Sequence, residues 1–260
     1  MEDAKDPTER FADRVRDYVK YRPAYPKALL PLLRDQLGLH PGAVVADVGS
    51  GTGILSTLFV DFGNVVYGVE PNDAMRRAAE VLLAGRRFRS VAARAEATTL
   101  APRSVDGIVV GQAFHWFDAG AARLEFLRIL KPGGWVALIW NSRRTAGTPF
   151  LVAYEQFLGR WCAEYPDIRT QCANTESLET LFGQVGYRQD SLANQQVFDY
   201  EGLKGRLLSS SYAPGTDDPQ QPAMLRDLRR LFEEYSEEES VRFEYDTEVY
   251  YGRLSSIPVP

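Results

Sequence analysis

Short apolar runs alternate with amphipathic stretches along the first half of the chain. The apolar runs predict strands over residues 43–48, 65–70, 88–92, 107–111 and 135–140. Between them, apolar residues at helical spacing predict helices over residues 27–37, 54–61, 73–84 and 119–130. Asn72 or Asp73 is expected to cap the third of these helices. Strands that alternate with helices in this way are typical of βα units and indicate a parallel sheet.

Two local signals modify these boundaries. Pro31 interrupts the pattern of the 27–37 helix, which we therefore expect to kink or to begin late. The sequence Lys131-Pro132-Gly133-Gly134 predicts a helix stop followed by a turn.

The second half of the chain has a different pattern. Residues 150–183 are helical and amphipathic, and residues 221–235 predict a further amphipathic helix. Residues 195–200 and 241–254 predict strands, and the second has the two-residue alternation of an antiparallel strand. The pattern thus contains seven strands in total.

Composition and charge argue against several classes of function. The chain has 260 residues, of which 45% are apolar and 25% charged, as in globular proteins. Its net charge of −5 argues against sequence-independent binding of nucleic acid, which depends on Lys and Arg. The charged start and the absence of a long apolar run predict no membrane span, and we expect a cytoplasmic protein. Two cysteines, Cys162 and Cys172, and two histidines predict neither a disulfide framework nor a metal site.

The segment VVADVGSGTGILSTLF, residues 44–59, contains three closely spaced glycines between a strand and a helix. Such a turn presents backbone N–H groups and a helix N-terminus to a ligand, and glycine allows close approach to the main chain. The dinucleotide fingerprint G-x-G-x-x-G requires a glycine where this chain has Ile54. A purely structural glycine turn is the other alternative.

The order of several motifs resembles the class I S-adenosylmethionine-dependent methyltransferases. Asp47 and the three glycines resemble the first motif of that family, D/E-x-G-x-G-x-G, and Glu70 stands at the end of the next predicted strand. Ala95-Glu96, VVGQAFHWFD (109–118) and LKPGGWVALIWN (130–141) resemble its later motifs. FADRVRDYVKYRPAYP (11–26) and LLSSSYAP (207–214) resemble the branch that includes trans-aconitate methyltransferase. The resemblance covers nearly the whole chain and is most specific from 44 to 141.

The resemblance implies a fold, a cofactor and a site. The fold is α/β, with a Rossmann-like, doubly wound, seven-stranded sheet that is mostly parallel, an antiparallel C-terminal strand and a mainly helical cap. The cofactor is S-adenosyl-L-methionine, and Glu70 is expected to accept hydrogen bonds from its ribose hydroxyls. Many relatives have Asp just before the Ala-Glu pair, where this chain has Arg94. The cofactor-binding residues implied are Tyr18, Tyr21, Arg22, Asp47, Gly49, Ser50, Gly51, Thr52, Gly53, Glu70, Pro71, Met75, Ala95, Glu96, Gln112, Ala113 and His115.

The acceptor is expected to be a small molecule. We predict a single domain over residues 1–260, in which residues 1–28 form a lid and the helical insertion 142–185 forms a substrate cap. Tyr25, Trp116, Asn141 and Tyr212 are the candidate pocket residues. The aromatic residues among them could equally be ordinary packing residues, and Arg22 could form a surface ion pair instead of binding a ligand.

His115 is the candidate catalytic residue, because an unperturbed imidazole suits general-base catalysis near neutral pH. We favour the alternative that it supports the loop or contacts the cofactor. The predicted function is methyl transfer by in-line displacement, which depends mainly on proximity and orientation. The alternatives are a catalytically silent cofactor-binding protein with a regulatory or scaffold role and, less favoured, an NAD-dependent oxidoreductase.

Overall fold

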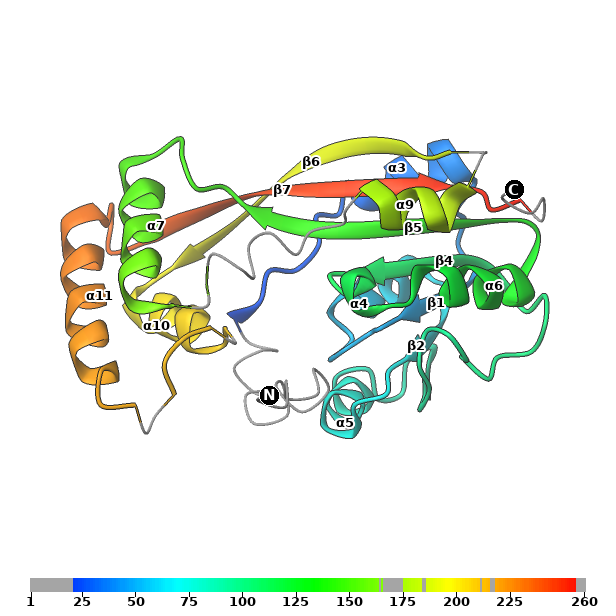
Figure 1. Cartoon of the computed structure of the whole chain (residues 1–260), viewed down its shortest axis with the longest axis horizontal. Coiled ribbons are helices and arrows are strands. Elements are labelled where there is room, and N and C mark those ends of the chain that lie inside the picture. Colours follow the sequence, from blue (N-terminus) through cyan, green and yellow to red (C-terminus); the bar gives the residue numbers. More distant parts are fainter. Residues whose placement is uncertain are drawn as a thin grey trace.

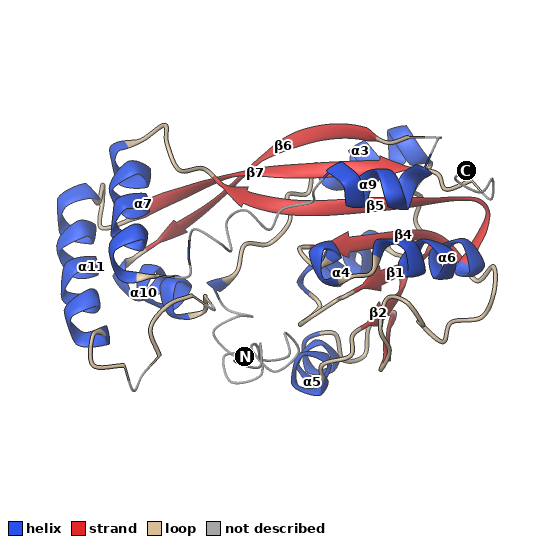
Figure 2. Ribbon diagram, viewed as in Figure 1, coloured by secondary structure: helices blue, strands red, loops and turns tan. Residues whose placement is uncertain are grey.

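The computed structural model describes residues 21–163, 165, 175–183, 186–210, 212–215 and 218–255. Within them a seven-stranded sheet has the order β3-β2-β1-β4-β5-β7-β6 (Figures 1 and 2). Strands β1 to β5 are parallel to one another, and β7 is antiparallel to both of its neighbours. The predicted sheet is thereby confirmed. The strands are β1 (Val44–Val48), β2 (Val65–Val69), β3 (Phe88–Val91), β4 (Val105–Gly111), β5 (Leu130–Arg143), β6 (Arg188–Phe198) and β7 (Val241–Gly252).

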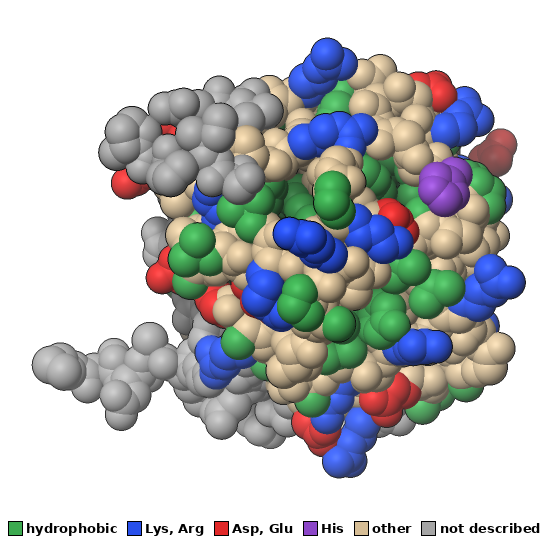
Figure 3. All heavy atoms as spheres, turned by 90° about the vertical axis from the view of Figure 1, so that its right-hand side faces the viewer, with side chains coloured by type: hydrophobic (Ala, Val, Ile, Leu, Met, Phe, Trp, Pro, Cys, Tyr) green, Lys and Arg blue, Asp and Glu red, His purple; other side chains and the backbone are tan. Residues whose placement is uncertain are grey.

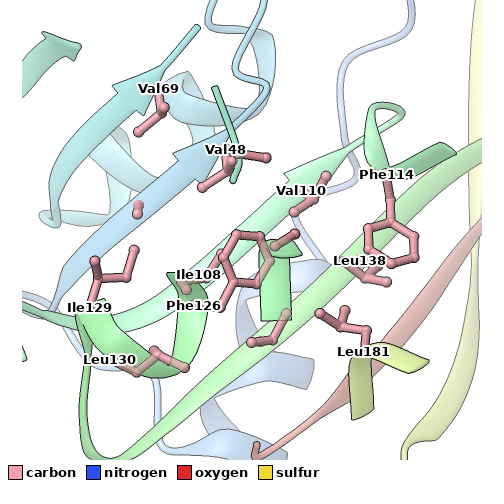
Figure 4. Packing of buried hydrophobic residues seen from close by; sticks show 14 of the residues in the cluster. Val48, Val69, Ile108, Val110, Phe114, Phe126, Ile129, Leu130, Leu138 and Leu181 are labelled. Atoms are coloured by element: carbon pink, nitrogen blue, oxygen red, sulfur yellow. The ribbon is translucent and has the colours of Figure 1, made fainter. Parts of the chain in front are cut away.

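Helices cover both faces of the parallel part of the sheet. Alternate residues of each strand point to opposite faces, so neighbours such as Val45 and Ala46 enter different hydrophobic clusters. One face packs on α3 and α4, and the other packs on α6 and α9. Figure 4 shows the second face, where Phe126 of α6 and Leu181 of α9 lie over the strands. The described helices are α3 (Leu29–Leu37), α4 (Ile54–Phe62), α5 (Asp73–Leu82), the 3₁₀ helix η2 (Phe114–Trp116), α6 (Ala119–Ile129), α7 (Pro149–Trp161), α9 (Thr175–Phe182), α10 (Tyr200–Leu208) and α11 (Gln221–Tyr235).

Strands β5, β6 and β7 extend well beyond the parallel strands and carry a third hydrophobic cluster at their far end (Figure 1). We call it the cap cluster; it consists of the buried residues of α7, α10 and α11 with the adjoining parts of β6 and β7. The predicted insertion 142–185 is divided between two places, since α7 lies in the cap cluster and α9 packs against α6. The N-terminal part of the described chain passes between the cap cluster and the parallel strands (Figure 1).

Several boundaries differ from the sequence prediction. The first helix begins at Leu29 instead of residue 27, which is the late start expected from Pro31, and Pro31 falls in its first turn, where an N–H has no helical acceptor. The Lys131–Gly134 turn lies inside β5, where the pairing with β4 shifts between Val105 and Gly107 and these residues loop out. The predicted strand 195–200 ends at Phe198, because the Asp199 side chain accepts the Gly202 N–H and starts α10.

On the face shown in Figure 3, the described charged side chains do not gather into a patch of one sign. Described Lys and Arg side chains there are scattered among acidic and hydrophobic ones. Among the described helices, none combines the length and the apolar character needed to cross a membrane.

Candidate functional site

The turn after β1 is held in one conformation by its glycines and by β2. Gly49, Gly51 and Gly53 have φ values of 69°, 54° and 82°, in the left-handed region that glycine adopts without steric cost. The Gly49 and Ser50 N–H groups both donate to the Val69 carbonyl, at 2.8 and 3.1 Å. The turn is therefore fixed against the carboxyl end of the neighbouring strand, and α4 begins directly after it.

The three glycines meet different surroundings. A Cβ on Gly49 would lie 2.6 Å from the Ala113 Cβ, and one on Gly53 would lie 3.0 Å from Leu83 and 3.2 Å from Ala79. Both positions are closed by the protein itself. A Cβ on Gly51 would meet no heavy atom of the described chain within 4 Å. The space beside Gly51 is thus open, and it is the position at which a ligand can approach the backbone.

Glu70 follows β2 and faces this turn. Its Oε2 accepts the Gly51 N–H at 2.9 Å, and its Oε1 accepts the Asn72 N–H at 2.8 Å. The residue is 8% exposed, and burial raises the pKa of its carboxyl despite these two bonds. Each carboxylate oxygen accepts more than one hydrogen bond, so both oxygens retain acceptor capacity for a ligand hydroxyl.

Two buried polar atoms near the turn have no hydrogen-bond partner among the described residues. Asp47 is fully buried; its Oδ2 accepts the Ser56 hydroxyl at 2.6 Å, and Oδ1 is one of these two atoms. Burial raises the pKa of Asp47 to about 7. The Thr52 hydroxyl is also buried without a partner. Leaving such groups unpaired costs on the order of 1–3 kcal/mol each, an expense that folds tolerate mainly at functional sites.

The segment after β2 places three predicted residues. Asn72 caps α5, because its Oδ1 accepts the Met75 N–H at 3.0 Å. Met75 is buried under this turn, whereas Pro71 is exposed beside Glu70. Asn72 was predicted as a possible cap, but its backbone contact with Glu70 was not.

Ala95 and Glu96 follow β3 in the chain and lie beside the loop after β4. Ala95 is buried and Arg94 is exposed. Glu96 Oε1 accepts the Asp118 N–H at 3.0 Å, and Asp118 in turn caps α6. Glu96 therefore ties two loops together, and its contact with adenine stays a prediction.

The loop after β4 bends sharply towards the glycine turn. Gln112 has a φ of 60°, which is uncommon for a residue other than glycine. Its N–H donates to the Ile139 carbonyl at 3.0 Å, and its Nε2 donates to the Asn141 carbonyl at 3.2 Å. These bonds to β5 hold the bend and press Ala113 against Gly49.

His115 lies in η2, next to that bend. Burial lowers the pKa of its imidazole to about 4, and no described residue forms a hydrogen bond with its buried Nδ1. The ring packs on Trp116 with a centroid separation of 4.5 Å, and Trp116 is 42% exposed. His115 is therefore neutral at pH 7, and its low pKa makes it a weak general base.

The N-terminal segment spans the distance between the two halves of the molecule. Tyr25 lies over Gly111, at the carboxyl end of β4. Tyr21 packs on Gly205 of α10, and Arg22 Nη2 donates to the Ser209 carbonyl at 3.2 Å. Tyr25 thus lies at the carboxyl end of β4, just before the loop that presses Ala113 against Gly49, whereas Tyr21 and Arg22 contact the cap. Tyr18 lies outside the described residues.

A set of amide side chains holds this segment in place. Asn194 Nδ2 donates to the Ala24 carbonyl at 2.8 Å and to Asn141 Oδ1 at 3.1 Å. Asn141 Oδ1 also accepts the Thr247 hydroxyl at 2.6 Å, and Gln196 Nε2 reaches the Tyr21 carbonyl at 3.2 Å. Asn141 was predicted as a pocket residue; Asn194 and Gln196 were not identified, because alternating polar residues also describe an exposed strand face.

Tyr212 lies in the cap, against Tyr165, with ring centroids 5.1 Å apart. The structure therefore brings the glycine turn, Glu70, Gln112, Ala113 and Tyr25 to one region, with Tyr21, Arg22 and Tyr212 on the cap side of it. No cluster of three or more metal-ligating side chains occurs among the described residues. A groove of about 520 Å³ lies elsewhere, between α7 and α11, and contains none of the predicted residues.

Comparisons with known proteins connect this geometry with a family. The family described as methyltransferase domain matches residues 46–138. An uncharacterized methyltransferase of Mycobacterium tuberculosis is 36% identical over 143 residues, which cover 54% of this chain and 55% of the relative. The match thus spans about half the length of that relative.

Solved structures share the fold at low sequence identity. A candidate type II methyltransferase from Anaeromyxobacter dehalogenans has a TM-score of 0.67 at 22% identity, covering 90% of this chain and 98% of its own. Phosphoethanolamine N-methyltransferase 2 of Haemonchus contortus, in complex with phosphomonomethylethanolamine and S-adenosylhomocysteine, has a TM-score of 0.55 at 15% identity. That match covers 94% of this chain and 57% of the nematode protein.

Proposed function

We propose, on the premise that residues 46–138 belong to the methyltransferase domain family, that this chain transfers a methyl group from S-adenosylmethionine to a small-molecule acceptor. The observation that carries the proposal is the open space beside Gly51, next to a buried Glu70 carboxylate. The φ of Gly51 alone is a structural need for glycine, so the argument depends on the combination: beside the open space lie a buried carboxylate and, at Asp47 and Thr52, buried polar atoms without a partner among the described residues.

The residues present fit such a cofactor. Glu70 supplies acceptors for two ribose hydroxyls, and the glycine turn with the start of α4 supplies backbone donors for a carboxylate. When bound, S-adenosylmethionine would supply an activated methyl group for displacement by a nucleophile of the acceptor. The remaining cofactor-binding assignments rest on the family resemblance.

The chain's own contribution is to bind and orient. Holding two reactants in line accounts for up to about 7–11 kcal/mol of a barrier, so no further catalytic group is required by energy alone. His115, with its pKa lowered to about 4, is neutral and held against Trp116. We assign it to support of the loop after β4 rather than to proton abstraction. Tyr25 and Asn141 are the parts of the candidate acceptor site that adjoin this loop.

The test is methyl transfer from labelled S-adenosylmethionine to a library of small metabolites, with Glu70→Ala as the matched negative control. We expect incorporation into at least one metabolite by the wild type and little by the variant. A protein that binds the cofactor and methylates no member of a broad library would instead support the catalytically silent alternative. A cytoplasmic location belongs to this proposal as well.

A further inference from the structure

Arg206 is a buried cation with no acidic partner among the described residues. It lies in α10, is 8% exposed, and its Nη1 donates to the Ser210 hydroxyl at 2.9 Å. Its Nε is buried and has no hydrogen-bond partner in the part of the chain that the structure describes. The hydroxyls of Tyr154, Tyr212 and Tyr245 lie close enough to interact with the guanidinium.

Other buried arginines in this protein are compensated. Arg123 is equally buried, and its guanidinium donates to the Leu181 carbonyl at 2.5 Å and the Ser255 carbonyl at 2.7 Å. Arg143, at the end of β5 and over the rings of Tyr154 and Phe243, donates to Glu155 at 2.7 Å. Arg206 is different, because it has neither carbonyl acceptors nor an acidic partner among the described residues.

Tyr154, one of the tyrosines near Arg206, is not a counterion, because burial raises the pKa of its hydroxyl and keeps it neutral at pH 7. Neutral hydroxyls solvate a guanidinium partly but leave its charge in place. Proteins bury an arginine chiefly with a partner, and its planar fork suits carboxylate and phosphate groups.

The position of Arg206 relates it to the acceptor side of the site. The residue before it, Gly205, is covered by Tyr21, and Ser209 three residues later accepts a bond from Arg22. Tyr245, which interacts with Arg206, donates to Gln196, and Gln196 holds the Tyr21 backbone. Arg206 therefore lies beside the segment whose other end, Tyr25, packs on Gly111 at the carboxyl end of β4.

We propose that Arg206, with the hydroxyls of the surrounding tyrosines and Ser210, binds an anionic group of the methyl acceptor. The group is a carboxylate or a phosphate, both of which accept two parallel bonds from the guanidinium fork. That the anionic group belongs to a methyl acceptor rests on the proposed function. The binding of an anion at Arg206 is testable independently of that function.

The experiment is calorimetric titration of the full chain with succinate and, separately, inorganic phosphate, at constant ionic strength set with chloride, with and without S-adenosylhomocysteine. We expect saturable binding of at least one anion to one site. Binding of succinate alone assigns a carboxylate, and binding of phosphate alone assigns a phosphoryl group. Absence of binding by both anions overturns the proposal.

Three variants locate the site. Arg206→Met should weaken binding at least tenfold, whereas Arg160→Met, which removes a 71% exposed arginine of the same cap, should leave it unchanged. Arg206→Lys keeps the charge and loses the fork, and it should bind at least threefold more weakly; it carries the test if Arg206→Met does not fold. Wild-type anion affinity in a folded Arg206 variant overturns the assignment. Every variant should bind S-adenosylhomocysteine with an affinity within twofold of the wild type. Failure of the wild-type chain to bind S-adenosylhomocysteine contradicts the proposed function instead.

Discussion

The variant Gly51→Ala tests whether this glycine is needed for a ligand or only for its backbone conformation. The added methyl group meets no described atom within 4 Å, so the substitution creates no clash inside the protein. The cost to folding comes only from the φ of 54°, and a left-handed alanine costs about 1–2 kcal/mol. Cofactor binding should suffer separately, because the methyl group occupies the space beside the Glu70 carboxylate.

Gly42 provides the matched control. Its φ is 88°, and a Cβ there also meets no atom within 4 Å, but it lies in the turn before β1. Urea unfolding should give similar losses for Gly42→Ala and Gly51→Ala, about 1–2 kcal/mol each. Calorimetry with S-adenosylhomocysteine should show at least tenfold weaker binding for Gly51→Ala, no measurable binding for Gly51→Val, and wild-type affinity for Gly42→Ala. Equal affinities of the two alanine variants would refute the assignment of the open space to the cofactor.

Three further predictions concern titratable groups near the turn. Glu70→Ala should weaken S-adenosylhomocysteine binding at least tenfold, since a hydrogen bond to a charged group contributes about 1.5–3 kcal/mol, and an unchanged Kd places the ribose elsewhere. Asp47→Asn should remove a pH dependence of the free energy of unfolding. Because the folded-state pKa of about 7 exceeds the unfolded value, the contribution of Asp47 to wild-type stability is complete below about pH 4. It declines by on the order of 4 kcal/mol as pH rises to about 7. Urea unfolding at pH 4.5 and 7.5 checks this, and parallel slopes for wild type and variant would contradict it. His115→Asn should lower cofactor affinity or stability more than the single-turnover rate at saturating cofactor; a hundredfold slower rate with intact binding would identify His115 as the base.

Local pattern was sufficient for the parallel half of the fold. Val44–Val48, the glycines and the helix from Ile54 are contiguous, and the run of strand, turn and helix specifies its own geometry. Glu70 could be placed as well, because the carboxyl ends of neighbouring parallel strands meet at one edge of the sheet. The contact of its carboxylate with the Gly51 N–H follows from that placement.

The cap could not be derived in this way. Arg22 binds Ser209, 187 residues away, and Asn194 binds Ala24, 170 residues away, so these contacts depend on how β6 and α10 pack. The sequence YEGLKGRLL contains two basic residues of similar appearance, yet Lys204 pairs with Glu201 at the surface while Arg206 is buried. Only the tertiary structure distinguishes the two.

The central claim is that the turn at residues 49–53 holds S-adenosylmethionine. Its most direct test is isothermal titration of the wild-type chain with S-adenosylhomocysteine and, under identical conditions, with NAD. We predict saturable 1:1 binding of S-adenosylhomocysteine and no measurable binding of NAD, since Ile54 occupies the position of the third dinucleotide glycine. Binding of NAD in place of S-adenosylhomocysteine, or of neither, would contradict the claim.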